Sequence, residues 1–212
     1  MRYWKPLKIH KPEKIRIVAA SYFNNDKKRF CASKCFINSI LNQTYDNFEL
    51  FIVHDGPIDR TEEAEDFIAS IKDPRIKLFE TEKREGKYGY PHRKKYAFLN
   101  EDFDWLIFTN DDNYYVPVAL ETFLHGCQKL DKKIIYSNML SSHKFWFPLI
   151  TDFQKEKLDL GGFMIHKDIM RDYNFVLSEN NCFVADGLLI NQLRLDHSDK
   201  IVKLDNFLYI HN

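Results

Sequence analysis

Residues 104–117 read DWLIFTNDDNYYVP and join a short apolar run to a cluster of acids and amides. The apolar run, residues 105–108, has the length of a buried strand and is too short to span a membrane. It ends at residues 110–113 (NDDN), where the adjacent carboxylates Asp111 and Asp112 repel each other unless positive charge lies beside them. A hard divalent cation such as Mg²⁺ or Mn²⁺ takes oxygen ligands of this kind. The stretch therefore predicts a strand with a metal-binding or ligand-binding tip, and the alternative is a plain polar turn.

Strands and helices are predicted to alternate on both sides of this stretch. Before it, strands are expected at residues 14–20, 48–53 and 75–79, and helices at 27–42, 62–71 and 92–99. After it, helices are expected at 118–130 and 186–195, and strands at 133–137, 158–165 and 201–210, the last as one or two short strands. This alternation predicts an α/β fold with a largely parallel sheet. The carboxyl ends of such strands share one edge, which would bring Asp55 close to Asp111 and Asp112.

Three further stretches are less regular. Residues 80–91 are charged and contain two glycines, so a mobile loop is expected there. Residues 145–148 (FWFP) predict an apolar loop or short strand, whose aromatic side chains either shape an acceptor site or join the core. Gly161 and Gly162 indicate a close backbone approach within the 158–165 strand.

Composition limits the class of protein. A length of 212 residues, without repeats or a linker, predicts one domain with a full core. Lys and Arg balance Asp and Glu to a net charge of +0, so no attraction to nucleic acid is expected. The basic start has no apolar run after it, and no stretch is long enough for a transmembrane helix. The four scattered cysteines fit free thiols better than a zinc site. A soluble, cytoplasmic protein is predicted.

Several stretches, in this order along the chain, resemble family 2 glycosyltransferases. They are IRIVAASYFNN (15–25), SILNQTYDNFEL (39–50), FELFIVHDGPIDRT (48–61), FTNDDNYYVP (108–117), LGGFMIHKDIM (160–170) and VADGLLINQL (184–193). The NDDN segment is similar to the family's metal-binding DXD region, in the form found in the spore-coat polysaccharide type. The resemblance covers nearly the whole chain from residue 15 onward.

The resemblance implies a GT-A fold, an α/β/α sandwich with a mostly parallel central sheet. It implies metal-dependent transfer, with inversion, of a sugar from a nucleotide diphosphate sugar, expected to be a UDP-sugar. The acceptor would be a hydroxyl group, for example of a glycan, and the metal Mn²⁺ or Mg²⁺. Residues 14–117 would form the nucleotide-sugar-binding half, and residues 118–212 the acceptor and catalytic half.

On the donor side, the resemblance assigns roles to individual positions. Ala20 and Ser21 would lie beside the base of the nucleotide, and Asp55 would accept a hydrogen bond from its uracil ring. Asp111 would lie near the ribose. Arg93 or Lys94 would fill the basic position that precedes the central strand, and the local match does not choose between them.

On the catalytic side, the resemblance assigns metal binding to Asp112 and His211 and the general base to Asp186. Asp186 could instead be only a helix cap, and His211 only part of a frayed terminus. Two positions depart from the family pattern. His54 stands where Asp is common, and Asn110 stands at the first acid of the DXD region.

Two other functions compete with this interpretation. A sugar-phosphate nucleotidyltransferase would also use an α/β sheet and Mg²⁺, but that class usually has a Gly-rich phosphate loop after its first strand. The corresponding SYFNND (21–26) contains no glycine. A non-catalytic nucleotide-sugar or glycan-binding module of the same fold is the second alternative, and the intact acids Asp112 and Asp186 argue against it.

Overall fold

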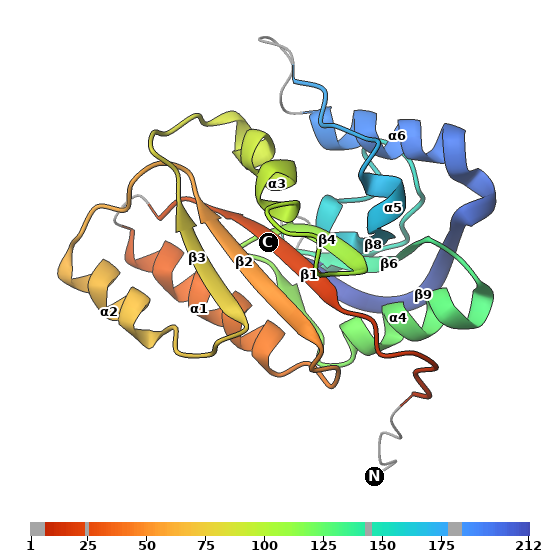
Figure 1. Cartoon of the computed structure of the whole chain (residues 1–212), viewed down its shortest axis with the longest axis horizontal. Coiled ribbons are helices and arrows are strands. Elements are labelled where there is room, and N and C mark those ends of the chain that lie inside the picture. Colours follow the sequence, from red (N-terminus) through yellow and green to blue (C-terminus); the bar gives the residue numbers. More distant parts are fainter. Residues whose placement is uncertain (1–6, 24–25, 143–145, 178–183) are drawn as a thin grey trace.

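The computed structural model of the chain describes residues 7–23, 26–142, 146–177 and 184–212. Within these ranges one nine-stranded sheet runs through the molecule in the order β3-β2-β1-β4-β8-β6-β9-β5, and β7 pairs with β6 outside this path. Helices cover both faces of the sheet (Figure 1). The expected α/β class is therefore confirmed.

The first part of the sheet is parallel, as expected. Its strands are β1 (Ile15–Ser21), β2 (Phe48–His54), β3 (Ile76–Glu80) and β4 (Trp105–Asn110). β1 lies between β2 and β4, and β3 pairs with the outer side of β2. All seven residues of β2 are buried, which is the pattern of a strand covered on both faces.

Two separate hydrophobic clusters show why three layers form. Helices α1 (Lys27–Leu41), α2 (Glu62–Ser70) and α4 (Ala119–Leu130) pack on one face, where Ile15, Ile17 and Ala19 of β1 point. Helices α3 (Tyr90–Ala97), α5 (Lys167–Met170) and α6 (Ala185–His197) pack on the other face, which receives Val18. Alternate residues of a strand point to opposite faces, so one strand supplies both cores.

The later strands add antiparallel pairs to the mostly parallel sheet. They are β5 (Tyr114–Tyr115), β6 (Ile134–Ser141), β7 (Phe147–Leu149), β8 (Phe163–His166) and β9 (Ile201–His211). β8 runs antiparallel to both β4 and β6, whereas β9 runs parallel to β6. The segment expected to form one or two short strands is the single strand β9, with a register irregularity opposite Ser137 and Asn138.

The prediction of a strand over residues 158–165 is wrong in its first half. Leu160–Gly162 forms a 3₁₀ turn, because the Asp159 carboxylate accepts a hydrogen bond from the Gly161 amide at 2.8 Å. The close backbone approach is confirmed, since a Cβ on Gly161 would lie 2.5 Å from the Tyr209 ring. Only the part from Phe163 onward is a strand.

The structure shows where α2 and α3 begin. Thr61 caps α2, accepting a hydrogen bond from the Ala64 amide at 3.3 Å. The expected loop 80–91 contains a 3₁₀ turn, Lys87–Gly89, and α3 begins two residues earlier than expected. In the described parts of the chain, no helix combines the length and the apolar character needed to cross a membrane.

Candidate active site

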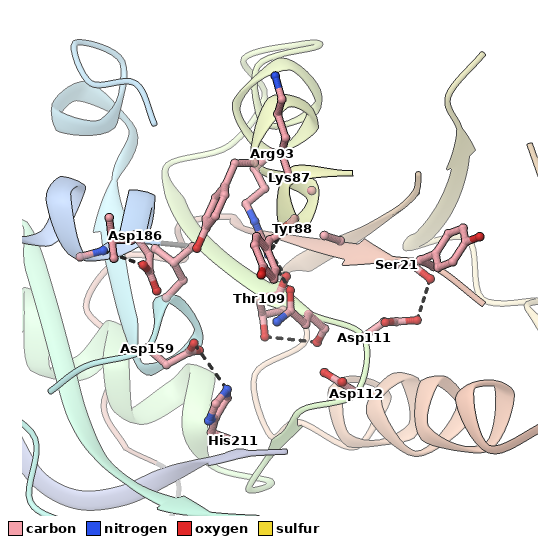
Figure 2. A pocket seen from close by; sticks show the side chains of 18 of the residues that line it. Ser21, Lys87, Tyr88, Arg93, Thr109, Asp111, Asp112, Asp159, Asp186 and His211 are labelled. Carbon is pink, nitrogen blue, oxygen red and sulfur yellow. Dashed lines mark hydrogen bonds and ion pairs between the residues drawn. The ribbon is translucent and has the colours of Figure 1, made fainter. Parts of the chain in front are cut away.

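A cleft of about 1010 Å³ opens at the carboxyl ends of the parallel strands and extends over the later half of the chain. Most residues singled out from the sequence line it. They are Ala20, Ser21, Asp55, Arg93, Asp111, Asp112, Asp186 and His211. Figure 2 shows Asp111 and Asp112 on one side of this cleft and Asp159 and Asp186 on the other, with His211 between them. Lys94 is not among the described residues that line it.

The strand register brings the donor-side residues together. Ser21 of β1 pairs with His54 of β2, and Ala20 pairs with Asn110 of β4. The residues that follow these strands therefore meet at one edge. The expectation that Asp55 lies at the same edge as Asp111 and Asp112 is confirmed.

Asp111 is a buried acid held by two hydroxyl groups. Its Oδ2 accepts a hydrogen bond from Ser21 Oγ at 2.7 Å and another from Ser33 Oγ. Burial raises the pKa of Asp111 to about 6, and the hydroxyl groups and Arg29 oppose this rise. Additional hydrogen-bond donors, such as a pair of sugar hydroxyls, would favour the ionised form.

Asp112 carries an unsatisfied oxygen. Its Oδ1 is buried and has no hydrogen-bond partner among the described residues. Burial raises the pKa of Asp112, and the Arg29 guanidinium, whose Nη1 lies 3.8 Å from Oδ2, lowers it. A buried carboxylate oxygen without a partner carries a free-energy cost, which a bound cation would remove.

His211 enters the cleft from the end of β9. Its Nε2 lies 3.7 Å from Asp159 Oδ2, and its ring stacks on Tyr209 with centroids 6.4 Å apart. The described residues contain no group of three or more His, Cys, Asp or Glu side chains arranged to hold a metal. A metal here would need ligands from a bound substrate in addition to Asp112 and His211, as Mg²⁺ sites commonly do.

Asp55 holds the loop before α3, a contact that the sequence did not predict. Its Oδ1 accepts from the Glu85 amide at 2.8 Å and lies 3.0 Å from His92 Nε2, while Oδ2 accepts from the Gly86 amide at 2.8 Å. Oδ2 keeps a lone pair for another donor. The carboxylate therefore ties the loop to the edge of the sheet.

Arg93 reaches the cleft from α3 as a buried cation. Only 3% of the residue is exposed, and its Nη atoms donate to the Thr109 carbonyl, to Asn110 Oδ1 at 2.5 Å and to the Tyr88 carbonyl at 3.4 Å. Its Nε has no partner, and the guanidinium forms no salt bridge with any residue that the structure describes. Burial lowers the pKa of Arg93. An unneutralised buried cation beside a cleft is a site for an anion.

The neighbouring Lys94 has a different role. Its Nζ donates to the Arg171 carbonyl at 2.7 Å and to the Tyr173 carbonyl at 2.5 Å, which joins α3 to the segment after α5. Of the two candidates for the basic position, Arg93 alone contributes to the cleft lining among the described residues.

Asp186 lies in the first turn of α6, and the N-cap position belongs to Val184. Its Oδ1 accepts a hydrogen bond from the Gly187 amide at 2.7 Å. Burial raises the pKa of Asp186, and hydrogen bonds from Gly187 and the Tyr90 side chain oppose this rise. Asp186 is therefore a half-buried acid directed into the cleft instead of a helix cap.

Sequence reasoning missed Asp159. Its Oδ1 accepts from Tyr209 Oη at 2.6 Å as well as from Gly161, and its Oδ2 faces His211. The only signal in the sequence was an acid before a Gly-Gly pair. Tyr209 lies 50 residues further along the chain, and periodicity contains no information about this contact.

His54, one of the two departures from the family pattern, lies behind the cleft wall. It is buried, its Nδ1 lies 2.8 Å from the Gly56 carbonyl, and its Nε2 accepts from the Phe23 amide at 3.1 Å. This arrangement requires the neutral ring with the proton on Nδ1. The ring stacks on Tyr22, which lines the cleft. Of the FWFP aromatics, Trp146 and Phe147 are exposed, and Phe145 lies outside the described residues.

This architecture, a three-layer sandwich with a cleft at the carboxyl edge of its sheet, is the GT-A fold of nucleotide-diphospho-sugar transferases. Residues 34–148, more than half of the chain, match the family model described as glycosyl transferase family 2. The chain belongs to this family, as its sequence motifs indicated. A relative from Rickettsia typhi (strain ATCC VR-144 / Wilmington), described as an uncharacterized glycosyltransferase, is 30% identical over 171 residues, which cover 76% of this chain and 50% of that protein.

Solved structures show the same fold. S. aureus TarS (residues 1–349) is 16% identical with a TM-score of 0.71, covering 94% of this chain and 60% of that chain. The same protein in complex with UDP-GlcNAc gives a TM-score of 0.70 at 16% identity, with coverages of 93% and 58%. A mannosyltransferase from Pyrobaculum calidifontis, in complex with GDP-Man and Mn²⁺, gives 0.69 at 12% identity, with coverages of 98% and 60%. The chain thus spans half of the length of the Rickettsia typhi relative and about three fifths of the length of these three solved chains.

Proposed function

We propose that this chain transfers a sugar, with inversion at the anomeric carbon, from a nucleotide diphosphate sugar to a hydroxyl group of an acceptor. The observation that carries the proposal is the pairing, in one cleft, of the buried cation Arg93, which has no salt bridge to a described residue, with a carboxylate oxygen of Asp112 that has no hydrogen-bond partner among them. A diphosphate that carries a divalent cation would satisfy both groups at once. The complexes of similar structures with UDP-GlcNAc, and with GDP-Man and Mn²⁺, support this class of donor.

The base and ribose of the donor would bind at the ends of β1 and β2, in the half formed by residues 14–117. Ala20, Ser21 and Asp55 would contact the base, and the family resemblance favours uracil. Asp111 would accept hydrogen bonds from the ribose hydroxyls, as it already accepts them from the hydroxyls of Ser21 and Ser33. Arg93 would bind a diphosphate oxygen through its Nε, which has no partner in the part of the chain that the structure describes.

Asp112 and His211 are the residues that would hold Mn²⁺ or Mg²⁺. The fit rests on the hard oxygen ligand of Asp112, whose Oδ1 has no partner in the described part of the chain. The bound cation would supply positive charge to the departing nucleoside diphosphate without transferring a proton. Asp159 would keep the His211 ring in position from a distance of 3.7 Å.

Asp186 would act as the general base. The acceptor oxygen attacks the anomeric carbon, the bond to the diphosphate oxygen breaks, and its electron pair leaves with the nucleoside diphosphate. The acceptor proton moves to the Asp186 carboxylate. Because burial raises the pKa of Asp186, the carboxylate is a stronger base than an exposed Asp. Residues 118–212, which contain Asp186, would bind the acceptor.

The products formed from a nucleotide sugar and Mn²⁺ test this proposal against its alternatives. A panel of UDP-sugars and GDP-sugars is first ranked by thermal shift, because a ligand that binds the native state raises its apparent stability. Release of nucleoside diphosphate from the best donor supports glycosyl transfer. Release of pyrophosphate would indicate a nucleotidyltransferase, and binding without turnover would indicate a non-catalytic module.

A further inference from the structure

Two large aromatic side chains lie exposed where β7 begins. Trp146 is 61% exposed and Phe147 is 67% exposed. Folded proteins seldom expose adjacent large apolar side chains, and such patches mark binding surfaces when they adjoin a groove. The sequence left open whether these aromatics join the core or shape an acceptor site. Their exposure excludes the core.

Strand register places Phe147 on the side of the sheet that faces the cleft. Ser141 of β6 pairs with Phe147 on one side and with His211 of β9 on the other. Directly paired residues project to the same face of a sheet, and both Ser141 and His211 line the cleft. Neighbouring strands are about 4.8 Å apart, so the backbone of Phe147 lies about 10 Å from that of His211 along this row.

The next row of the sheet supports this placement. Met139 of β6 pairs with Leu149 of β7 and with Tyr209 of β9, and both Met139 and Leu149 line the cleft. Phe147 precedes Leu149 by two residues on the same strand, so both project to one face. Phe147 therefore extends the cleft wall outward.

The chain after β7 links this wall to Asp186. Lys155, Glu156 and Leu158 line the cleft. Lys155 packs so closely against α6 that a Cβ on Gly187, the residue after Asp186, would lie 2.5 Å from Lys155 Cγ. Phe147 thus lies on a continuous wall that ends at the proposed base, and Trp146 immediately precedes it.

Trp146 has an unusual backbone conformation. Its φ angle is 63°, and its amide donates to the Ser141 carbonyl at 3.0 Å. A bulky residue in the left-handed region is an outlier. Such strain is concentrated at functional sites, where the surrounding structure maintains it.

We propose that Trp146 and Phe147 form a stacking platform for a sugar ring of an oligosaccharide acceptor. This inference rests on the proposed transferase function and specifies its acceptor. One face of a pyranose consists of C–H groups, and stacking this face on an aromatic ring removes apolar surface from water while the hydroxyls stay solvated. A span of about 10 Å from His211 exceeds one sugar ring, so the acceptor has several units.

Fluorine NMR of protein labelled with fluorotryptophan tests the platform. Trp146 is one of three tryptophans, and its signal is assigned with Trp146→Phe. Trp105, only 3% exposed, is an internal reference. The probes are linear tetrasaccharides of glucose, N-acetylglucosamine, mannose and galactose. We expect at least one to shift the Trp146 signal saturably and to leave the Trp105 signal unchanged.

Two serine variants show whether the platform has the proposed orientation. Phe147→Ser should weaken that binding at least tenfold. Ile150→Ser should leave the affinity unchanged, because Ile150 is equally exposed at 70% but follows the end of β7, outside the paired rows that carry Phe147 and Leu149. Equal affinity in wild type and Phe147→Ser would overturn the platform, as would no response of Trp146 to any of the four probes.

A response of the Trp146 signal to phosphatidylcholine–phosphatidylglycerol vesicles but not to the glycans would also overturn the stacking platform. Trp146 and Phe147 would then form a lipid contact. Binding of UDP with Mn²⁺ is titrated in the same samples. Loss of UDP binding with glycan binding intact would contradict the proposed donor chemistry and leave the platform standing. Intact UDP binding without any glycan response would contradict the platform and leave the proposed donor chemistry standing.

Discussion

At the scale of single residues, two adjacent acids have different surroundings. Asp111 is held by the hydroxyls of Ser21 and Ser33, whereas Asp112 keeps an oxygen without a partner among the described residues. Sequence alone showed a pair of carboxylates after a strand. The structure adds the asymmetry between them, which suits a contact with hydroxyl groups at Asp111 and a contact with a cation at Asp112.

Asp112→Asn should weaken Mn²⁺-dependent binding of UDP at least about tenfold, or about 1.4 kcal/mol, because the charged oxygen ligand is lost. Asp111→Asn is the matched variant and should have a smaller effect, since an amide oxygen still accepts hydrogen bonds from hydroxyls. Isothermal titration calorimetry with and without Mn²⁺ measures both. Equal losses in the two variants would show that these roles are assigned wrongly.

A second prediction at this scale concerns His54. Burial lowers its pKa, so the folded protein keeps the ring neutral while the unfolded chain protonates it below about pH 6.5. The unfolded state then binds more protons, and the free energy of unfolding falls as the pH drops below about 6.5. Urea unfolding of the wild type and His54→Asn between about pH 5 and pH 8 measures this contribution.

The stability difference between wild type and His54→Asn should shrink as the pH falls. Asp111, whose pKa is raised to about 6, favours folding at low pH and so acts in the opposite direction. It is present in both proteins, and its effect cancels in the difference. A difference that stays constant with pH would contradict the assignment of a neutral, buried His54.

At the scale of elements, the loop between β3 and α3 connects the sheet edge to the cleft. Asp55 binds its Glu85 and Gly86 amides, and the following residues Lys87 and Tyr88 line the cleft. The side chains of Lys83, Arg84 and Lys87 are exposed. We expect donor binding at this edge to order the loop, as lids do in other enzymes.

Trypsin cleavage after Lys83, Arg84 and Lys87 tests this expectation. Cleavage should slow when UDP and Mn²⁺ are added, and it should be faster in Asp55→Asn, whose amide group cannot accept from both backbone N–H groups as the carboxylate does. Asp66→Asn, at an exposed position on α2, is the control and should behave like the wild type. Identical cleavage rates with and without UDP would show that the loop is only a connection.

Some elements could be predicted from the sequence, and others depend on contacts between distant residues. β1, β2 and β4 follow from the apolar runs at residues 17–20, 50–53 and 105–108, because a strand covered on both faces needs no distant partner to be recognised. The turn at Leu160–Gly162 does not follow from any local pattern. It depends on Asp159 bonding to Tyr209, and on Tyr209 filling the space beside Gly161.

At the scale of the whole molecule, the cleft brings together residues from the start, middle and end of the chain. The resemblance to family 2 pointed to eight of the residues that line it, because motifs keep their order along the sequence. It could not choose between Arg93 and Lys94, since adjacent helix residues point in different directions and only packing decides which enters the cleft. It also missed Asp159 and the double hydrogen bond of Asp55 to a loop 30 residues away.

The central claim, that one cleft binds a nucleotide sugar and that Asp186 removes the acceptor proton, is tested most directly by Asp186→Asn. Turnover of a nucleotide sugar that the wild type uses is measured beside calorimetric binding of UDP with Mn²⁺. We expect a fall in turnover of about two to four orders of magnitude, because the amide cannot take the proton. We expect nearly unchanged UDP affinity, because Asp111 and Asp112 lie on the opposite side of the cleft and Asp55 directly follows β2. Turnover at the wild-type rate, with UDP binding intact, would contradict it.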